Sequence, residues 1–95
     1  MTERRESEIV ALLRDLSLAP GPPAHEAGVR EVILDALQDV GGLEISHDRL
    51  GSLIVEKPGS RPAPRVALDA HLDEVGFMIE SIRDDGMLSF VALGG

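Results

Sequence analysis

A proline-rich break at residues 19–23, reading Ala-Pro-Gly-Pro-Pro, constrains the fold of this chain more than any other feature. Proline lacks an amide donor and fixes its own φ angle, so a helix cannot continue through this segment. Apolar residues recur at helical spacing on both sides of the break: Ile9, Leu12, Leu13 and Leu16 before it, and Val29, Val32, Ile33, Ala36, Leu37 and Val40 after it. The pattern predicts one amphipathic helix from Ser7, a rigid loop, and a second helix that Gly41-Gly42 ends.

After these glycines the period of the apolar residues changes from helical to alternating. Residues 43–47 and 53–55 read as two strands of a hairpin, and Val66-Ala67-Leu68 reads as a short third strand. Residues 75–82 and 87–93 flank an Asp85-Gly86 pair, which is a strong hairpin signal. The order of elements predicts an α/β fold, with two helices and mixed strands, that runs into a second, all-β element beginning near Asp73 or Glu74.

Composition narrows the possible functions. The net charge of −8 opposes binding to nucleic acid, whose phosphates would be repelled. The chain has no cysteine, so only histidine and carboxylate side chains remain as strong metal ligands, and a reducing compartment is favoured. The charged first residues lead straight into an amphipathic pattern, and they predict a cytoplasmic protein without a signal peptide or membrane span.

The residues best suited to chemistry lie in the run Asp69-Ala70-His71-Leu72-Asp73-Glu74, at the end of the predicted third strand. The two-residue period of a strand places His71 and Asp73 on one face and Glu74 on the other. In a metal site, His71 would coordinate through one ring nitrogen while the Asp73 carboxylate fixes the other. Spacing alone also fits a histidine that caps a strand beside solvated carboxylates.

Four blocks extend this motif in sequence order: Ala19-Pro20-Gly21-Pro22, Asp48-Arg49-Leu50-Gly51-Ser52-Leu53-Ile54, Ala70-His71-Leu72-Asp73-Glu74-Val75-Gly76-Phe77-Met78, and Asp85-Gly86-Met87-Leu88-Ser89-Phe90. Together they resemble the amino-terminal portion of the M42 family of metallo-aminopeptidases, which includes glutamyl and deblocking aminopeptidases. The resemblance implies a hydrolase that releases N-terminal residues from peptides with a water bridging two divalent metal ions, zinc or cobalt. It also implies a homo-oligomer.

By position, the resemblance implies that His71 is a metal ligand. It implies that Asp73 is a catalytic residue, the acidic side chain that orients His71. Residues 1–73 would begin the α/β catalytic domain, and residues 74–95 would form the first hairpin of an inserted β-rich dimerisation domain. The family's other ligands and its general base fall outside these 95 residues. We therefore expect the 95-residue chain alone to be inactive. His25 and His47 match no family ligand.

Two other functions remain open from the sequence. A truncated, non-catalytic acidic module could pair through an exposed β edge. A glycoside hydrolase needs two carboxylates that face each other across a sugar bond. Neighbouring pairs such as Asp84 and Asp85 are poorly placed for that geometry, and the only aromatic residues are Phe77 and Phe90.

Overall fold

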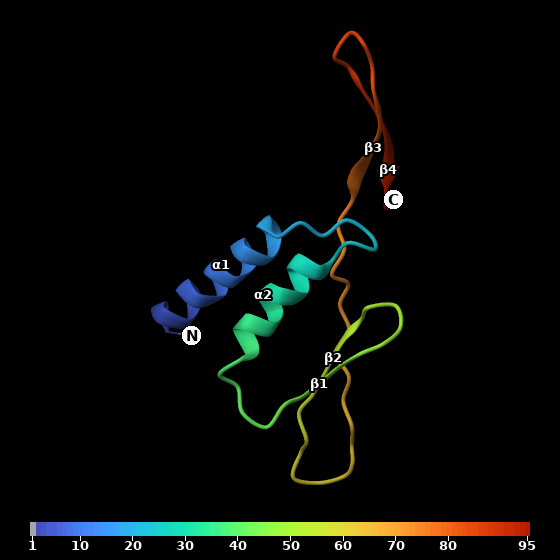
Figure 1. Ribbon diagram of the computed structural model, residues 1–95. Helices are drawn as coiled ribbons and strands as arrows, with labels where there is room; N and C mark the ends of the chain where they lie inside the picture. Colours follow the sequence, from blue (N-terminus) through green and yellow to red (C-terminus); the bar gives the residue numbers. More distant parts are fainter. Residues whose placement is uncertain (1) are drawn as a thin grey trace.

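A computed structural model describes residues 2–95, and in them two helices are followed by two separate antiparallel hairpins (Figure 1). Helix α1 spans Glu3–Leu18 and begins before Ser7, because the Thr2 hydroxyl accepts a hydrogen bond from the Arg5 amide at 3.4 Å. Helix α2 spans Ala27–Leu37, so it ends before the two glycines. Neither helix is long and apolar enough to cross a bilayer.

The first hairpin confirms the strands predicted after α2. Strand β1 (Glu44–His47) pairs antiparallel with β2 (Leu53–Glu56), and Ile45 lies opposite Val55. Asp48 shapes the turn between them, because its carboxylate accepts hydrogen bonds from the amides of Leu50 at 2.9 Å and Ser52 at 2.8 Å. This turn lies next to α2.

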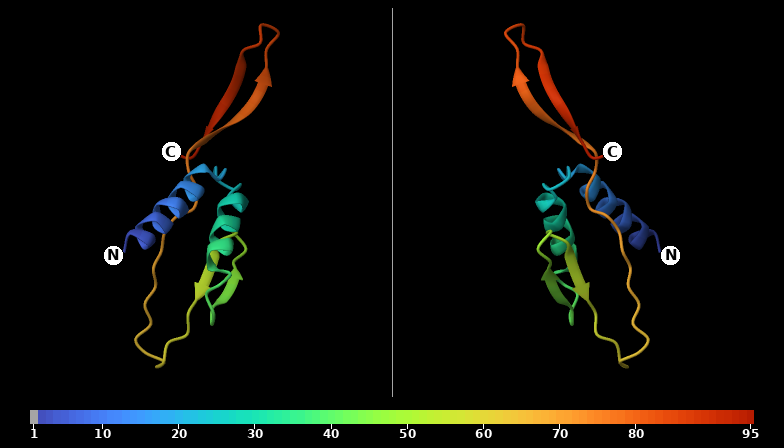
Figure 2. Two further views of the ribbon diagram at one scale, coloured as in Figure 1. Left: turned by 90° about the vertical axis from the view of Figure 1, so that its left-hand side faces the viewer. Right: turned by 90° about the vertical axis from the view of Figure 1, so that its right-hand side faces the viewer.

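The second hairpin also forms where the Asp-Gly signal predicted it. Strands β3 (Gly76–Ile82) and β4 (Leu88–Leu93) pair antiparallel, with a register shift between Ile79 and Ser81. Gly86 adopts a φ of 83° in the turn, a conformation that glycine adopts at no steric cost. The hairpin projects away from both helices (Figures 1 and 2).

The predicted third strand over Val66-Ala67-Leu68 is wrong. Residues 57–75 carry no strand and run as a single length of chain from β2 past the helices to β3 (Figure 2). An apolar run forms a ladder only if another strand supplies hydrogen bonds, and in residues 2–95 none lies beside this one. The two helices and two small sheets are nevertheless consistent with part of an α/β fold.

Very little of the described chain is buried. Its radius of gyration is 18.0 Å, whereas a compact domain of 100 residues has a value of about 13 Å. Across residues 2–95, only Gly21 and Val29 are buried, and they meet where the proline loop, residues 19–23, crosses the start of α2. The helices and hairpins leave most of their apolar side chains exposed.

Candidate functional site

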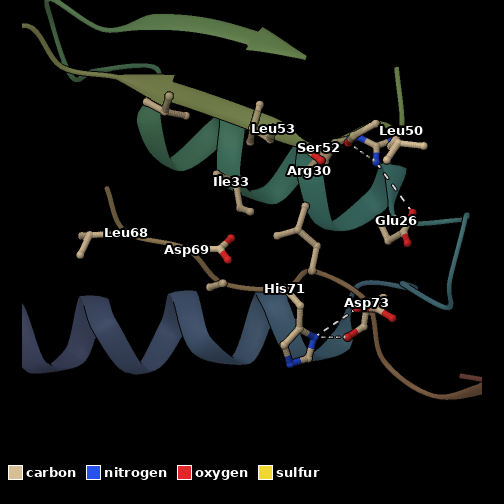
Figure 3. A pocket seen from close by; sticks show the side chains of 14 residues that line it. Glu26, Arg30, Ile33, Leu50, Ser52, Leu53, Leu68, Asp69, His71 and Asp73 are labelled. Atoms are coloured by element: carbon tan, nitrogen blue, oxygen red, sulfur yellow. Dashed lines mark hydrogen bonds and ion pairs between the residues drawn. The ribbon is translucent and has the colours of Figure 1, made fainter. Parts of the chain in front are cut away.

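His71 and Asp73 lie in direct contact. The Nδ1 atom of His71 lies 2.9 Å from the main-chain carbonyl oxygen of Asp73 and 3.2 Å from its carboxylate Oδ1 (Figure 3). The segment is not a strand, so the contact arises from the local path of the chain and not from a strand's two-residue period. The sequence anticipated the carboxylate as a partner but not the carbonyl, which is the nearer of the two.

These contacts assign the tautomer of a neutral imidazole. Both oxygens near Nδ1 act as acceptors, so Nδ1 carries the hydrogen and donates it, which leaves the lone pair on Nε2. The His71 side chain is 85% exposed and that of Asp73 is 42% exposed. Nε2 is therefore a free electron-pair donor, as a histidine metal ligand requires.

A hollow of about 500 Å³ lies beside this pair, between α2, the turn before β2 and the chain leading to His71. Its lining combines apolar and charged side chains: Glu26, Arg30, Ile33, Leu50, Ser52, Leu53, Val55, Leu68, Asp69, Leu72, His71 and Asp73, with Gly51 and Ala70. Figure 3 shows the His71 ring on the side of its segment that faces away from Ile33, with Nδ1 turned toward Asp73. The imidazole therefore lies at the rim of the hollow.

Arg30 links α2 to the turn of the first hairpin across this hollow. Its Nη1 donates a hydrogen bond to the Gly51 carbonyl at 3.1 Å and lies 3.9 Å from the Glu26 carboxylate. Glu26 in turn accepts a hydrogen bond at 2.9 Å from the amide of Ala24, which has a φ of 67°. Together these groups join one wall of the hollow to Ala24, the residue directly after the proline loop. The Glu26 to Arg30 spacing is visible in the sequence as a helical i, i+4 pair, but the contact with Gly51 is not.

Asp48 has a pKa below its ordinary value. The main cause is the hydrogen bond that its carboxylate accepts from the Ser52 amide, and the amides of Leu50 and Gly51 lower the pKa further. These bonds favour the charged form of the side chain. The Asp48 side chain is exposed and does not line the hollow. Its hydrogen bonds instead fix the shape of the turn next to the hollow.

The other candidates do not join His71. His25 is exposed in the loop before α2, and His47 is exposed at the end of β1. Within residues 2–95, no three histidine, aspartate or glutamate side chains come together as a metal cluster. Asp85, in the turn of the second hairpin, pairs with Arg83 at 3.0 Å.

Comparisons with known proteins converge on one family. The family described as M42 glutamyl aminopeptidase matches residues 51–95. A lysyl aminopeptidase from Pyrococcus furiosus is 38% identical over 85 residues, covering 88% of this chain and 24% of that protein. A glutamyl aminopeptidase from Lactococcus lactis is 39% identical over 89 residues, covering 93% of this chain and 25% of that protein.

A putative aminopeptidase of Escherichia coli, FrvX, is 36% identical over 86 residues, which is 90% of this chain and 23% of that protein. This chain therefore spans about a quarter of the length of the curated relatives it matches. The similarity includes the stretch that holds His71 and Asp73.

Proposed function

Because this chain belongs to the M42 family of aminopeptidases, we propose that it forms the amino-terminal part of an enzyme that releases N-terminal residues from peptides. The relatives' names support the reaction, and the chain's share of their length supports its being one part of a larger enzyme. The single observation that carries the proposal is the contact of His71 Nδ1 with Asp73, which leaves Nε2 free.

In this proposal His71 is a ligand to a divalent metal ion, zinc or cobalt. The geometry of His71 fits that role. Its imidazole is exposed, its Nδ1 hydrogen is donated to Asp73, and its Nε2 lone pair is available to a metal ion. Asp73 acts through His71, because it holds the ring in one tautomer and direction. The described residues contribute one such ligand, so the others would come from polypeptide outside residues 2–95.

A pair of divalent ions, when bound, makes a water more acidic and stabilises the charge that develops on the amide oxygen. At this site, residues 2–95 offer the His71 imidazole and the Asp73 carboxylate that orients it. The general base that moves the proton to the leaving amine must be supplied elsewhere. Residues 1–95 alone therefore remain inactive in this proposal.

The division of the chain into two parts also belongs to the proposal. Residues 1–73 begin the catalytic α/β domain, and residues 74–95 provide the first hairpin of a β-rich dimerisation domain in a cytoplasmic homo-oligomer. The second hairpin supports this division, because it projects away from both helices (Figure 2). Most of its large apolar side chains are also exposed, among them Phe77 at 70% and Phe90 at 55%.

A non-catalytic interaction module is the second candidate, and the extent of exposed apolar surface favours it. The two functions differ in the size and the activity of the native gene product. An intact mass several times the 10.2 kDa of this chain, together with peptidase activity, supports the enzyme. A mass near 10.2 kDa without activity supports the module.

The decisive assay uses the native protein, treated with a chelator and then given Zn²⁺ or Co²⁺. Release of N-terminal residues from aminoacyl anilides should return with the metal, and His71→Ala should abolish it. His47→Ala is the matched control, because this histidine is also exposed but lies in β1. Full metal-dependent activity in the His71→Ala protein would overturn the proposed role of His71.

A further inference from the structure

The proline loop contacts the chain immediately after His71. The Gly21 carbonyl oxygen accepts a hydrogen bond of 2.8 Å from the Glu74 amide. The same loop approaches the start of β3, where a Cβ added to Gly76 would lie 3.0 Å from the Pro22 Cβ. The loop that separates the two helices therefore also holds the segment that carries the candidate metal ligand.

One peptide unit connects this hydrogen bond to the imidazole. The Glu74 N–H and the Asp73 carbonyl belong to the same planar group, and in a trans peptide they point in opposite directions. One end bonds Gly21 at 2.8 Å and the other lies 2.9 Å from His71 Nδ1. Hydrogen bonds in such a chain polarise one another, so each strengthens the next.

We propose that Gly21 is a positioning residue for His71, and that its carbonyl acts through the peptide unit joining Asp73 to Glu74. Fixing that unit fixes the Asp73 carbonyl, and the carbonyl holds the Nδ1 hydrogen and directs Nε2 outward. The consequence for metal binding rests on the proposed function, whereas the effect on the ring itself does not.

Glycine is required at position 21 by space. A Cβ there would lie 2.7 Å from the Val29 Cγ2 and 3.4 Å from the Leu72 carbonyl oxygen. Val29 is β-branched and sits in α2, so its side chain has little freedom to turn away. Gly21 and Val29 are also the two buried residues of the described chain. A methyl group at position 21 would therefore point into a packed contact and not into solvent.

The test uses Gly21→Ala in the native protein, with Gly41→Ala as the matched control because a Cβ at Gly41 meets nothing within 4 Å. The metal-free proteins are compared by ¹⁵N NMR of the neutral imidazoles and by hydrogen exchange of the Glu74 amide. In Gly21→Ala, we expect faster exchange of that amide and a shift of His71 from the Nδ1–H toward the Nε2–H tautomer. The signals of His47 should stay unchanged, as they should for every histidine in Gly41→Ala.

The second readout is binding of Co²⁺ to the metal-free protein. Loss of a group that orients a ligand typically lowers metal affinity 10- to 100-fold, and we expect Gly21→Ala to weaken Co²⁺ binding by about tenfold. Adding Val29→Ala removes the atom that the new methyl group meets, so the double variant should recover the His71 tautomer and most of the affinity.

The results separate three kinds of failure. An unchanged His71 tautomer in Gly21→Ala, despite faster exchange at Glu74, would overturn the positioning role of Gly21. No recovery in a folded double variant would overturn the steric argument for glycine. Unchanged Co²⁺ binding in His71→Ala would instead overturn the proposed function, while the tautomer measurement would still decide the role of Gly21.

Discussion

The nearest partner of the His71 ring is the main chain of Asp73, because Nδ1 lies 2.9 Å from the carbonyl oxygen and 3.2 Å from the carboxylate. An Asp73→Asn substitution removes the negative charge from the second contact, where an amide oxygen would still accept, and leaves the first contact available. The two atoms therefore make separable contributions to the orientation of the imidazole.

Asp73→Asn should accordingly weaken Co²⁺ binding by about tenfold, the low end of the range for groups that orient a metal ligand. The loss of charge weakens the hold on the Nδ1 hydrogen, but the carbonyl still accepts it. Calorimetric titration of the metal-free native protein measures the change, and Glu74→Gln, which removes a neighbouring carboxylate, serves as the control. A loss of 100-fold or more would show that the carboxylate dominates.

Arg30→Met should destabilise the native protein. It removes the hydrogen bond to the Gly51 carbonyl, and the Arg30 side chain is only 24% exposed, so solvent screens the bond less than at the open surface. We expect a loss of about 1 kcal/mol in the free energy of unfolding, as for a typical protein hydrogen bond. Urea denaturation measures it.

Arg4→Met is the matched control for Arg30→Met. Arg4 pairs with Glu8 at 3.2 Å, but its side chain is 89% exposed. An exposed pair of this kind contributes little, so the control should lie close to the native protein. Equal effects of the two substitutions would rule out a special role for the contact between Arg30 and Gly51.

The sequence predicted the features that depend on local periodicity. The spacing of Leu12 and Leu16 indicated α1, and the Asp85-Gly86 pair placed the turn of the second hairpin. The strand predicted at Val66-Ala67-Leu68 did not form, because an apolar run carries no information about whether a partner strand lies beside it.

In the candidate site, too, the sequence predicts contacts between near neighbours but not contacts between distant segments. His71 and Asp73 are two positions apart in the sequence, so their contact could be anticipated from it. The contact between Gly21 and Glu74 spans the whole of α2 and the first hairpin, and no local pattern encodes such an approach. A glycine between prolines was the only available signal, because glycine often marks a close approach of two backbones.

The turn formed by Asp48 should depend on pH. Its pKa is lowered in the folded chain by the hydrogen bond from the Ser52 amide, so the folded state binds a proton less readily than the unfolded state. The stabilisation is fully present above the ordinary pKa of an aspartate and is lost as the pH falls through the lowered value. Asp48→Ala should thus destabilise the protein at neutral pH, and the difference should vanish in acid.

Urea denaturation of the native and Asp48→Ala proteins across this pH range checks the expectation. Asp39→Ala, at an exposed position after α2, is the control. A destabilisation by Asp48→Ala that persists unchanged in acid would show that the carboxylate's charge is not what holds the turn. The amide proton shifts of Leu50 and Ser52 should titrate with the same midpoint, below the ordinary aspartate value.

The second hairpin should make the isolated chain associate. Residues 1–95 expose 8385 Å², whereas a compact protein of this mass exposes about 5,300 Å². The excess is larger than the roughly 800 Å² that each partner contributes to a standard protein interface. Phe77 and Phe90 contribute to it, and their rings pack edge to face with centroids 4.6 Å apart.

Produced alone, residues 1–95 should sediment above 10.2 kDa and bind a hydrophobic dye. Replacing Phe77 and Phe90 with lysine should reduce both signals, because the charges must then be buried for the hairpins to pair. Replacing Ser81 and Ser89 with lysine adds the same charge to the same hairpin without removing apolar surface. If that control dissociates the chain equally well, net charge and not the apolar hairpin governs association.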